Sequence, residues 1–210
     1  MPTPTVPLAA VADATRADRT ASTRFSTAMR RAGQTSATMP DSVWVPVVSG
    51  TLILAAGAMS LATGRPWLFP ALGPTALLIA VNPGHPTTRF HSIVVGHVVA
   101  IACGWLAVLL LGAGDGGRLF MGGGLTVARV WAGAFAVAGT ALIQPSLRAY
   151  HPPAAATALL VALGAYRSDL KTTLSLLAGV AVVALLGEWF QRLRLRVSTG
   201  RTGSGPSRAE

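Results

Sequence analysis

The sequence predicts an all-α integral membrane protein made of two repeats of three hydrophobic helices (long, short, long), with the second repeat inverted relative to the first. Of its 210 residues, 51% are hydrophobic and only 11% are charged, whereas about a quarter of the residues in a soluble domain are charged. Four apolar runs are long enough to cross a bilayer, and two shorter apolar runs resemble each other. A soluble fold of this size is therefore excluded.

The four long runs are the expected membrane spans. A helix needs about 20 apolar residues to cross the hydrocarbon core. Trp44, at the start of the first run, is of the type that anchors a span at the interface. The predicted spans are residues 44–63, 91–111, 126–147 and 172–190.

The two short runs are residues 68–81 and 152–163. Both contain prolines near their starts, and proline suits the first turn of a helix because the N–H that it lacks would have no partner there. The sequence predicts a short helix in each run and leaves open whether that helix crosses the membrane or re-enters it.

An internal repeat connects the short runs with the spans that follow them. Aligning Pro70 with Pro152 also aligns Thr75 with Thr157, and one further residue of offset aligns glycines of the following spans. Each half then has three helices, and an odd number of crossings requires the halves to be inverted, a plan common in transporters. Chance alignment of Ala- and Leu-rich helices is the alternative. The remaining matches are Ala76/Ala158, Leu77/Leu159, Leu78/Leu160, Ala80/Ala162, Ser92/Ser175, Gly96/Gly179 and Gly104/Gly187.

In the predicted domain organisation, a basic tail precedes the membrane domain in the sequence and another follows it. Residues 1–42 and 192–210 are expected to be disordered tails, and the membrane domain comprises repeat one (43–112), a linker (113–125) and repeat two (126–191). The net charge is +10, and most of it lies in the tails, which favours contact with anionic lipid headgroups over nucleic acid. The positive-inside rule predicts both termini in the cytoplasm, and we expect the chain in the cell (inner) membrane.

Two segments resemble a known family. His151-Pro152-Pro153 with the six residues after it, and residues 69–76 followed by Pro83 and His97, resemble the recurring blocks of the HPP family of integral membrane proteins. Some members of that family are described as nitrite transporters. The resemblance implies a membrane fold and a small inorganic anion, with nitrite as the candidate substrate.

The starts of the two short helices are the predicted anion site. Unpaired N–H groups and the helix dipole favour an anion at a helix N-terminus. If the repeats are inverted, both N-termini could meet near the midplane. The alternative is that the two threonines only bond to carbonyls of their own helices. The expected lining residues are Gly73, Thr75, Ala155, Ala156 and Thr157.

His97 and His151 complete the predicted substrate site. His97 lies inside a span, where a polar side chain usually faces the protein interior, and it could relay protons, contact an anion or simply bond to a neighbouring helix. His151 precedes the prolines of the second short helix. Because the four histidines have no neighbouring carboxylate and form no HxxxH pair, we expect neither a metal nor a cofactor.

The predicted function is transport of a small anion, by a channel or a carrier. A non-transporting scaffold or sensor subunit is the first alternative. A membrane enzyme that uses His97 and His151 is disfavoured, since neither histidine has an acidic partner in the sequence. Glycines that allow close helix approach, together with the thinness of a six-helix bundle, suggest a homo-oligomer.

Overall fold

The computed structural model describes residues 39–114, 124–166 and 169–199. Six α-helices and one 3-10 helix form within these residues. Most of both predicted tails and most of the predicted linker lie outside the described residues. All the described residues belong to one compact unit, residues 39–210.

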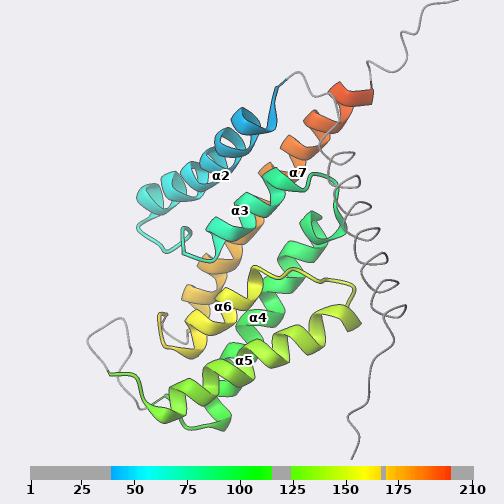
Figure 1. Cartoon of the computed structure of the whole chain (residues 1–210). Helices are drawn as coiled ribbons and strands as arrows, with labels where there is room; N and C mark the ends of the chain where they lie inside the picture. The colour runs from blue at the N-terminus through cyan, green and yellow to red at the C-terminus, as the bar shows by residue number, and fades with distance from the viewer. Residues whose placement is uncertain (1–38, 115–123, 167–168, 200–210) are drawn as a thin grey trace, which may run out of the picture. The chain divides into compact units, whose positions relative to one another are not determined.

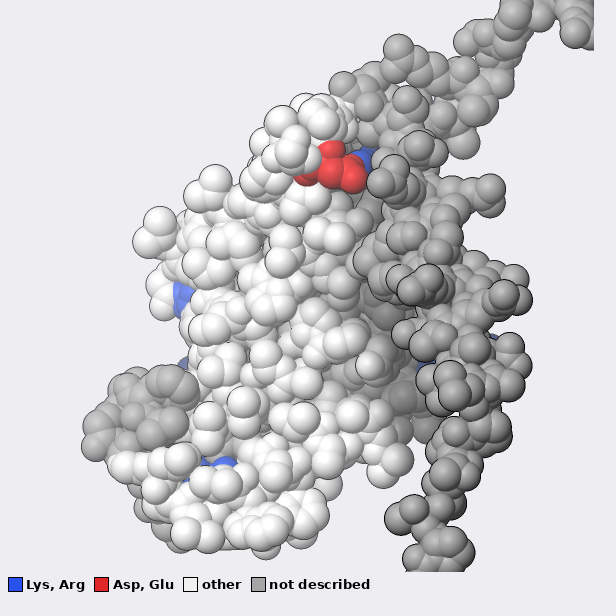
Figure 2. All heavy atoms as spheres, in the orientation of Figure 1, with Lys and Arg blue, Asp and Glu red and all other residues white. Residues whose placement is uncertain are grey.

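Four helices match the predicted spans. They are α2 (Asp41–Thr63), α4 (Phe90–Leu110), α5 (Val127–Ser146) and α7 (Leu170–Thr199). Each is long and apolar enough to cross a membrane, so the four predicted spans are confirmed as helices. Figure 2 shows one face on which charged side chains are few and lie toward its edges, with uncharged surface between them.

The helix α7 is longer than the span predicted for it. It continues past residue 191 to Thr199, into residues that the sequence assigned to the flexible tail. Arg194 explains part of the extension, because it forms an ion pair with Asp41 and its guanidinium lies 4.8 Å from the ring centroid of Trp44. Both partners belong to the first turn of α2, which therefore holds the end of α7.

The two predicted short helices are present. They are α3 (Leu72–Val81) and α6 (Ala154–Ala162), of 10 and 9 residues. At 1.5 Å per residue each is about 15 Å long, roughly half of the ~30 Å hydrocarbon core. A further 3-10 turn, η1 (Pro86–Thr88), precedes α4 and was not predicted.

Each short helix packs against one long helix from each half of the chain. The helix α3 contacts α2 and α7, and α6 contacts α5 and α4 (Figure 1). The helix α4 also packs on α5 and α7, and α2 packs on α7. The centre of the bundle is therefore formed by α3, α4, α6 and α7.

A side-chain donor holds the C-terminal end of each short helix. Trp44 Nε1 donates to the carbonyl of Ala80 at 3.2 Å, and Arg129 Nη1 donates to the carbonyl of Ala162 at 2.9 Å. Both donors lie in the first turn of a long helix. Sequence analysis alone would allow Arg129, near a span end, to extend into solvent, but the side chain is buried. There its positive charge faces the negative end of the α6 dipole.

Glycines set the distance between the short helices and their long partners. A Cβ on Gly104 of α4 would lie 2.8 Å from the Cβ of Val161 on α6, and one on Gly187 of α7 would lie 2.7 Å from Ile79 Cδ1 on α3. A Cβ on Gly96 would lie 3.3 Å from the Ala149 carbonyl oxygen. Close helix approach at small residues is thus used within this chain.

Candidate functional site

A buried histidine side chain joins the two short helices. Thr75 and Thr157 each occupy the first turn of a short helix, α3 and α6 respectively. The His97 side chain of α4 lies between them, with Nδ1 2.8 Å from Thr157 Oγ1 and Nε2 3.3 Å from Thr75 Oγ1. One imidazole therefore connects equivalent positions of the two short helices.

A second imidazole extends this cluster. His151 Nε2 lies 3.1 Å from Thr75 Oγ1, and its Nδ1 lies 2.8 Å from the carbonyl oxygen of Thr87 in η1. The two imidazole centroids are 5.3 Å apart. Thr75, His97, His151 and Thr157 are all completely buried, and we refer to these four residues as the His–Thr cluster.

The Thr87 carbonyl fixes the direction of one hydrogen bond in the cluster. A carbonyl oxygen only accepts, so His151 donates from Nδ1 to Thr87. Besides the two imidazoles, the Thr75 hydroxyl contacts the carbonyl oxygen of Ala71, four residues earlier, at 3.1 Å. A hydroxyl has a single proton, so Thr75 donates either to this carbonyl or to an imidazole nitrogen, and the remaining directions depend on the histidine tautomers. Every ring nitrogen has a partner.

Neighbouring side chains hold the two imidazoles in place. Gln144 of α5 donates from Nε2 to the Gly96 carbonyl at 3.2 Å and accepts at Oε1 from the His151 backbone N–H at 3.0 Å. The Phe69 ring meets the edge of His97 at a centroid distance of 6.1 Å. The sequence analysis missed Gln144, although an uncharged polar side chain within an apolar span is a signal for an interior position.

The remaining predicted lining residues lie beside the cluster but outside it. Gly73, Ala155 and Ala156 are partly exposed. Their N–H groups donate to the carbonyls of Pro70, Pro152 and Pro153 at distances of 3.2, 3.1 and 3.1 Å. An anion bound to these N–H groups would have to compete with the three proline carbonyls for them. The role of the three residues in anion binding stays a prediction.

The internal repeat relates the two threonines of the cluster but not its two histidines. In the alignment of the two halves, Phe69 is the counterpart of His151 and Val180 is the counterpart of His97. Both histidines thus have apolar counterparts, whereas the two threonines are equivalent.

The His–Thr cluster contains hydroxyl and imidazole groups and no carboxylate. Within residues 39–114, 124–166 and 169–199, no group of three or more His, Cys, Asp or Glu side chains could hold a metal. His85 is not one of the cluster residues, and its Nδ1 lies 2.8 Å from Thr87 Oγ1. Hydroxyl and imidazole N–H groups can donate to an anion, but here they bond to one another and to backbone carbonyls, so an anion would have to replace these bonds.

Comparison with known proteins addresses the family and not the substrate. No curated protein and no solved structure matches the chain. A family model described as the HPP transmembrane region matches residues 34–199, which include every helix described above. The resemblance of the two proline-containing segments is thereby confirmed: the chain is an integral membrane protein, and it belongs to the HPP family.

Proposed function

We propose that this protein moves a small inorganic anion across the membrane, with nitrite as the candidate from the family resemblance. The observation that carries the proposal is the meeting of two half-length helices at the His–Thr cluster. In transporters, substrate sites lie near the bilayer midplane, where the N-termini of broken or short helices point at the substrate. His97 lies about two turns into α4 (Phe90–Leu110), which supports a site inside the membrane.

Inversion of the two repeats is part of the proposal. Close contacts give the helix directions: Asp41 of α2 pairs with Arg194 of α7, and Gln191 of α7 bonds to Thr88 before α4. The helices α2 and α4 therefore both run opposite to α7. By the same reasoning α3 runs parallel to α7 and α6 runs parallel to α4, as Figure 1 shows. These directions support the proposal that repeat two is inverted relative to repeat one.

Equivalent contacts in the two halves support this inversion over a chance alignment. Gly104 faces Val161 while Gly187 faces Ile79, and Val161 and Ile79 are themselves aligned. Each aligned carbonyl, that of Ala80 or Ala162, accepts a side-chain N–H from the first turn of a long helix. The third pair of contacts consists of Gly96 with Ala149 and Gly179 with Trp67. Unrelated helices would not repeat contacts of this detail.

The inversion explains why the short helices meet. Gly96 and Gly179, which lie well inside their long helices, face the chain just before α6 and α3. Both short helices therefore begin inside the bundle, and each runs outward to a different end. Their first turns, with Thr75 and Thr157, meet where His97 bonds to both hydroxyls. We propose that the anion binds between these hydroxyls after displacing the His97 ring.

The orientation in the membrane follows from the tails. The start of α2 and the end of α7 lie at the same end of the bundle, because Asp41 pairs with Arg194. Both tails carry several arginines. We propose that this end faces the cytoplasm, by the positive-inside rule.

Uptake by proteoliposomes tests the proposal. Purified protein is reconstituted, and uptake of labelled nitrite, nitrate, formate and chloride is compared with uptake by empty vesicles and by vesicles that contain the Thr75→Val/Thr157→Val double variant. We expect saturable uptake of at least one anion by the wild type and reduced uptake by the variant. If no anion enters faster than into empty vesicles, the protein does not transport these anions.

A scaffold or sensor subunit that transports nothing is the second candidate. It is favoured by one observation, namely that each ring nitrogen in the His–Thr cluster has a hydrogen-bond partner from the protein itself. Such a cluster also serves to hold helices together. Absence of flux, together with strong destabilisation by the double variant, would support this function.

A further inference from the structure

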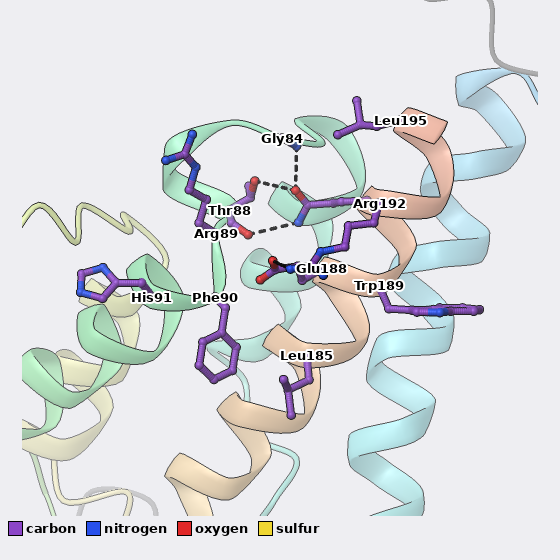
Figure 3. A pocket seen from close by; sticks show the side chains of 11 residues that line it. Gly84, Thr88, Arg89, Phe90, His91, Leu185, Glu188, Trp189, Arg192 and Leu195 are labelled. Atoms are coloured by element: carbon purple, nitrogen blue, oxygen red, sulfur yellow. Dashed lines mark hydrogen bonds and ion pairs between the residues drawn. The ribbon is translucent and has the colours of Figure 1, made fainter. Parts of the chain in front are cut away.

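A large groove lies away from the His–Thr cluster, between the start of α4 and the second half of α7. Its volume is about 740 Å³. The turn that contains η1 forms one wall, and α7 forms the other (Figure 3). None of the four cluster residues lines it, so the proposed transport site leaves this groove without a role.

A hydrogen-bonded glutamine fixes the two walls of the groove. Gln191 of α7 accepts at Oε1 from the Gly84 N–H at 2.7 Å and from the Thr88 hydroxyl at 3.1 Å, and its Nε2 donates to the Thr88 carbonyl at 3.1 Å. Figure 3 shows these bonds spanning from α7 to the turn. The groove therefore has a preformed shape, which lowers the entropic cost of binding.

The lining combines cationic groups with an apolar surface. Arg89 and Arg192 are exposed, as are Leu185 and Trp189 on α7. Figure 3 shows Phe90 of α4 and Leu185 of α7 on facing walls, and Arg192 extended toward Glu188. Arg192 Nη2 bonds to Glu188 Oε1 at 2.5 Å, which leaves other N–H groups of the same guanidinium for a second acceptor.

Aromatic residues indicate the level in the membrane at which the groove lies. Trp44 and Trp189 each pack against Phe190, at centroid distances of 6.3 and 4.9 Å. Trp is enriched at the membrane–water interface, and α7 carries arginines beyond this level at 192, 194 and 196. The arginines of the groove thus lie at headgroup depth, and Leu185 lies about one turn deeper than Trp189.

We propose that this groove is a binding site for one anionic phospholipid. Its headgroup phosphate binds Arg89 and Arg192, and an acyl chain lies along Phe90 and Leu185. A lipid fits better than a soluble anion, because the lining includes the exposed apolar side chains of Leu185, Trp189 and Leu195, which a soluble anion would leave bare. Glu188 lowers the affinity, since its carboxylate competes with the phosphate for Arg192. The inference does not depend on transport.

Retention of lipid by the purified protein tests the site. Protein in mild detergent is incubated with an equimolar mixture of phosphatidylglycerol and phosphatidylcholine, and the lipids retained after repurification are measured by mass spectrometry. The wild type is expected to be enriched in phosphatidylglycerol. Arg89→Gln and Arg192→Gln should each lower that enrichment about fivefold, the factor that one arginine near a membrane surface contributes.

Two further variants make the test specific. Glu188→Gln should raise the enrichment, and a gain of binding cannot result from misfolding. Arg65→Gln, which removes an exposed arginine just after the other end of α2, should leave it unchanged. Equal enrichment in the wild type and the Arg89→Gln/Arg192→Gln variant would overturn the proposal. An equal fall in Arg65→Gln would also overturn it, since the attraction would then be general. A dimer whose interface covers the groove and excludes lipid would also overturn the proposal.

Discussion

At the residue scale, the two threonines of the His–Thr cluster are equivalent in sequence but not in bonding. Thr75 Oγ1 contacts both imidazoles, whereas Thr157 Oγ1 contacts only His97. Leaving a buried polar atom without a partner costs about 1–3 kcal/mol. We therefore expect Thr75→Val to lower the melting temperature in detergent more than Thr157→Val does. Equal melting temperatures would contradict the bonding scheme.

The same substitutions test the anion site. If the first turn of α6 contributes a hydrogen bond worth about 0.5–1.5 kcal/mol, Thr157→Val should weaken the apparent anion affinity in uptake assays by roughly two- to tenfold. Thr157→Ser keeps the hydroxyl and is the matched control. Wild-type affinity in Thr157→Val, with unaltered flux in Thr75→Val, would show that the short helices do not form the site.

Substitution of His97 distinguishes a role in proton relay from a role in hydrogen bonding alone. The chain of hydrogen bonds ends on the Thr87 carbonyl, which cannot pass a proton on, so we expect the cluster not to conduct protons. Glutamine has an N–H donor group and a carbonyl acceptor, and a neutral imidazole likewise has a donor and an acceptor nitrogen. His97→Gln should therefore leave the pH profile of uptake unchanged, while His97→Leu should destabilise the protein. A shifted pH profile in His97→Gln would point to proton relay instead.

At the element scale, glycines determine how closely the short helices approach their partners. An added Cβ at Gly104 would meet the Val161 Cβ and, at 3.0 Å, the Ala158 carbonyl, whereas one at Gly187 would meet only side-chain atoms of Ile79, the nearest being the terminal Cδ1 at 2.7 Å and Cγ2 at 3.0 Å. A side-chain tip moves more easily than a helix backbone. We expect Gly104→Ala to be destabilising by about 1–3 kcal/mol and Gly187→Ala to be milder, as measured by thermal unfolding.

A control for these variants is available in α2. A Cβ on Gly50 would meet nothing within 4 Å, and alanine favours helix more than glycine does. Gly50→Ala should therefore keep or raise the melting temperature. A loss as large as that of Gly104→Ala would mean that glycine matters for a reason other than helix contact.

At the scale of the whole molecule, inversion of the repeats predicts where the arginines after α2 and α5 lie. Arg65 follows α2 and Arg148 follows α5, and these two helices are counterparts in the repeats. Cysteines at positions 65 and 148, introduced in a Cys103→Ala background, should react with a membrane-impermeant thiol reagent from opposite sides of the membrane. Reaction of both from one side would rule out the inversion.

The assembly state is a second question at this scale. The glycines that suggested an oligomer face atoms of their own chain, so they do not supply an intermolecular contact; they are Gly96, Gly104, Gly179 and Gly187. Exposed apolar side chains such as Trp131 and Phe135 on α5 are available for an interface or for lipid. We still predict a homo-oligomer. A mass in mild detergent equal to one chain would contradict it.

The sequence by itself determined the membrane class, the four spans, the two short helices and the family. These features depend on composition, on run length and on prolines, all of which act over a few neighbouring residues. It also singled out Thr75 and Thr157 from the repeat and from their places at the starts of the short helices, His151 from its place before the prolines, and His97 because a polar side chain inside a span usually faces the protein interior.

Only the tertiary structure decided which of these residues meet. The bond of His97 to both threonines, the support of His151 by Gln144 and Thr87, and the burial of Arg129 against Ala162 each join residues far apart in the chain. The groove between α4 and α7 also depends on residues far apart in the chain, since one glutamine from α7 bonds to the turn before α4. Local sequence patterns carry no information about such pairings, because the pairings arise only when the helices pack.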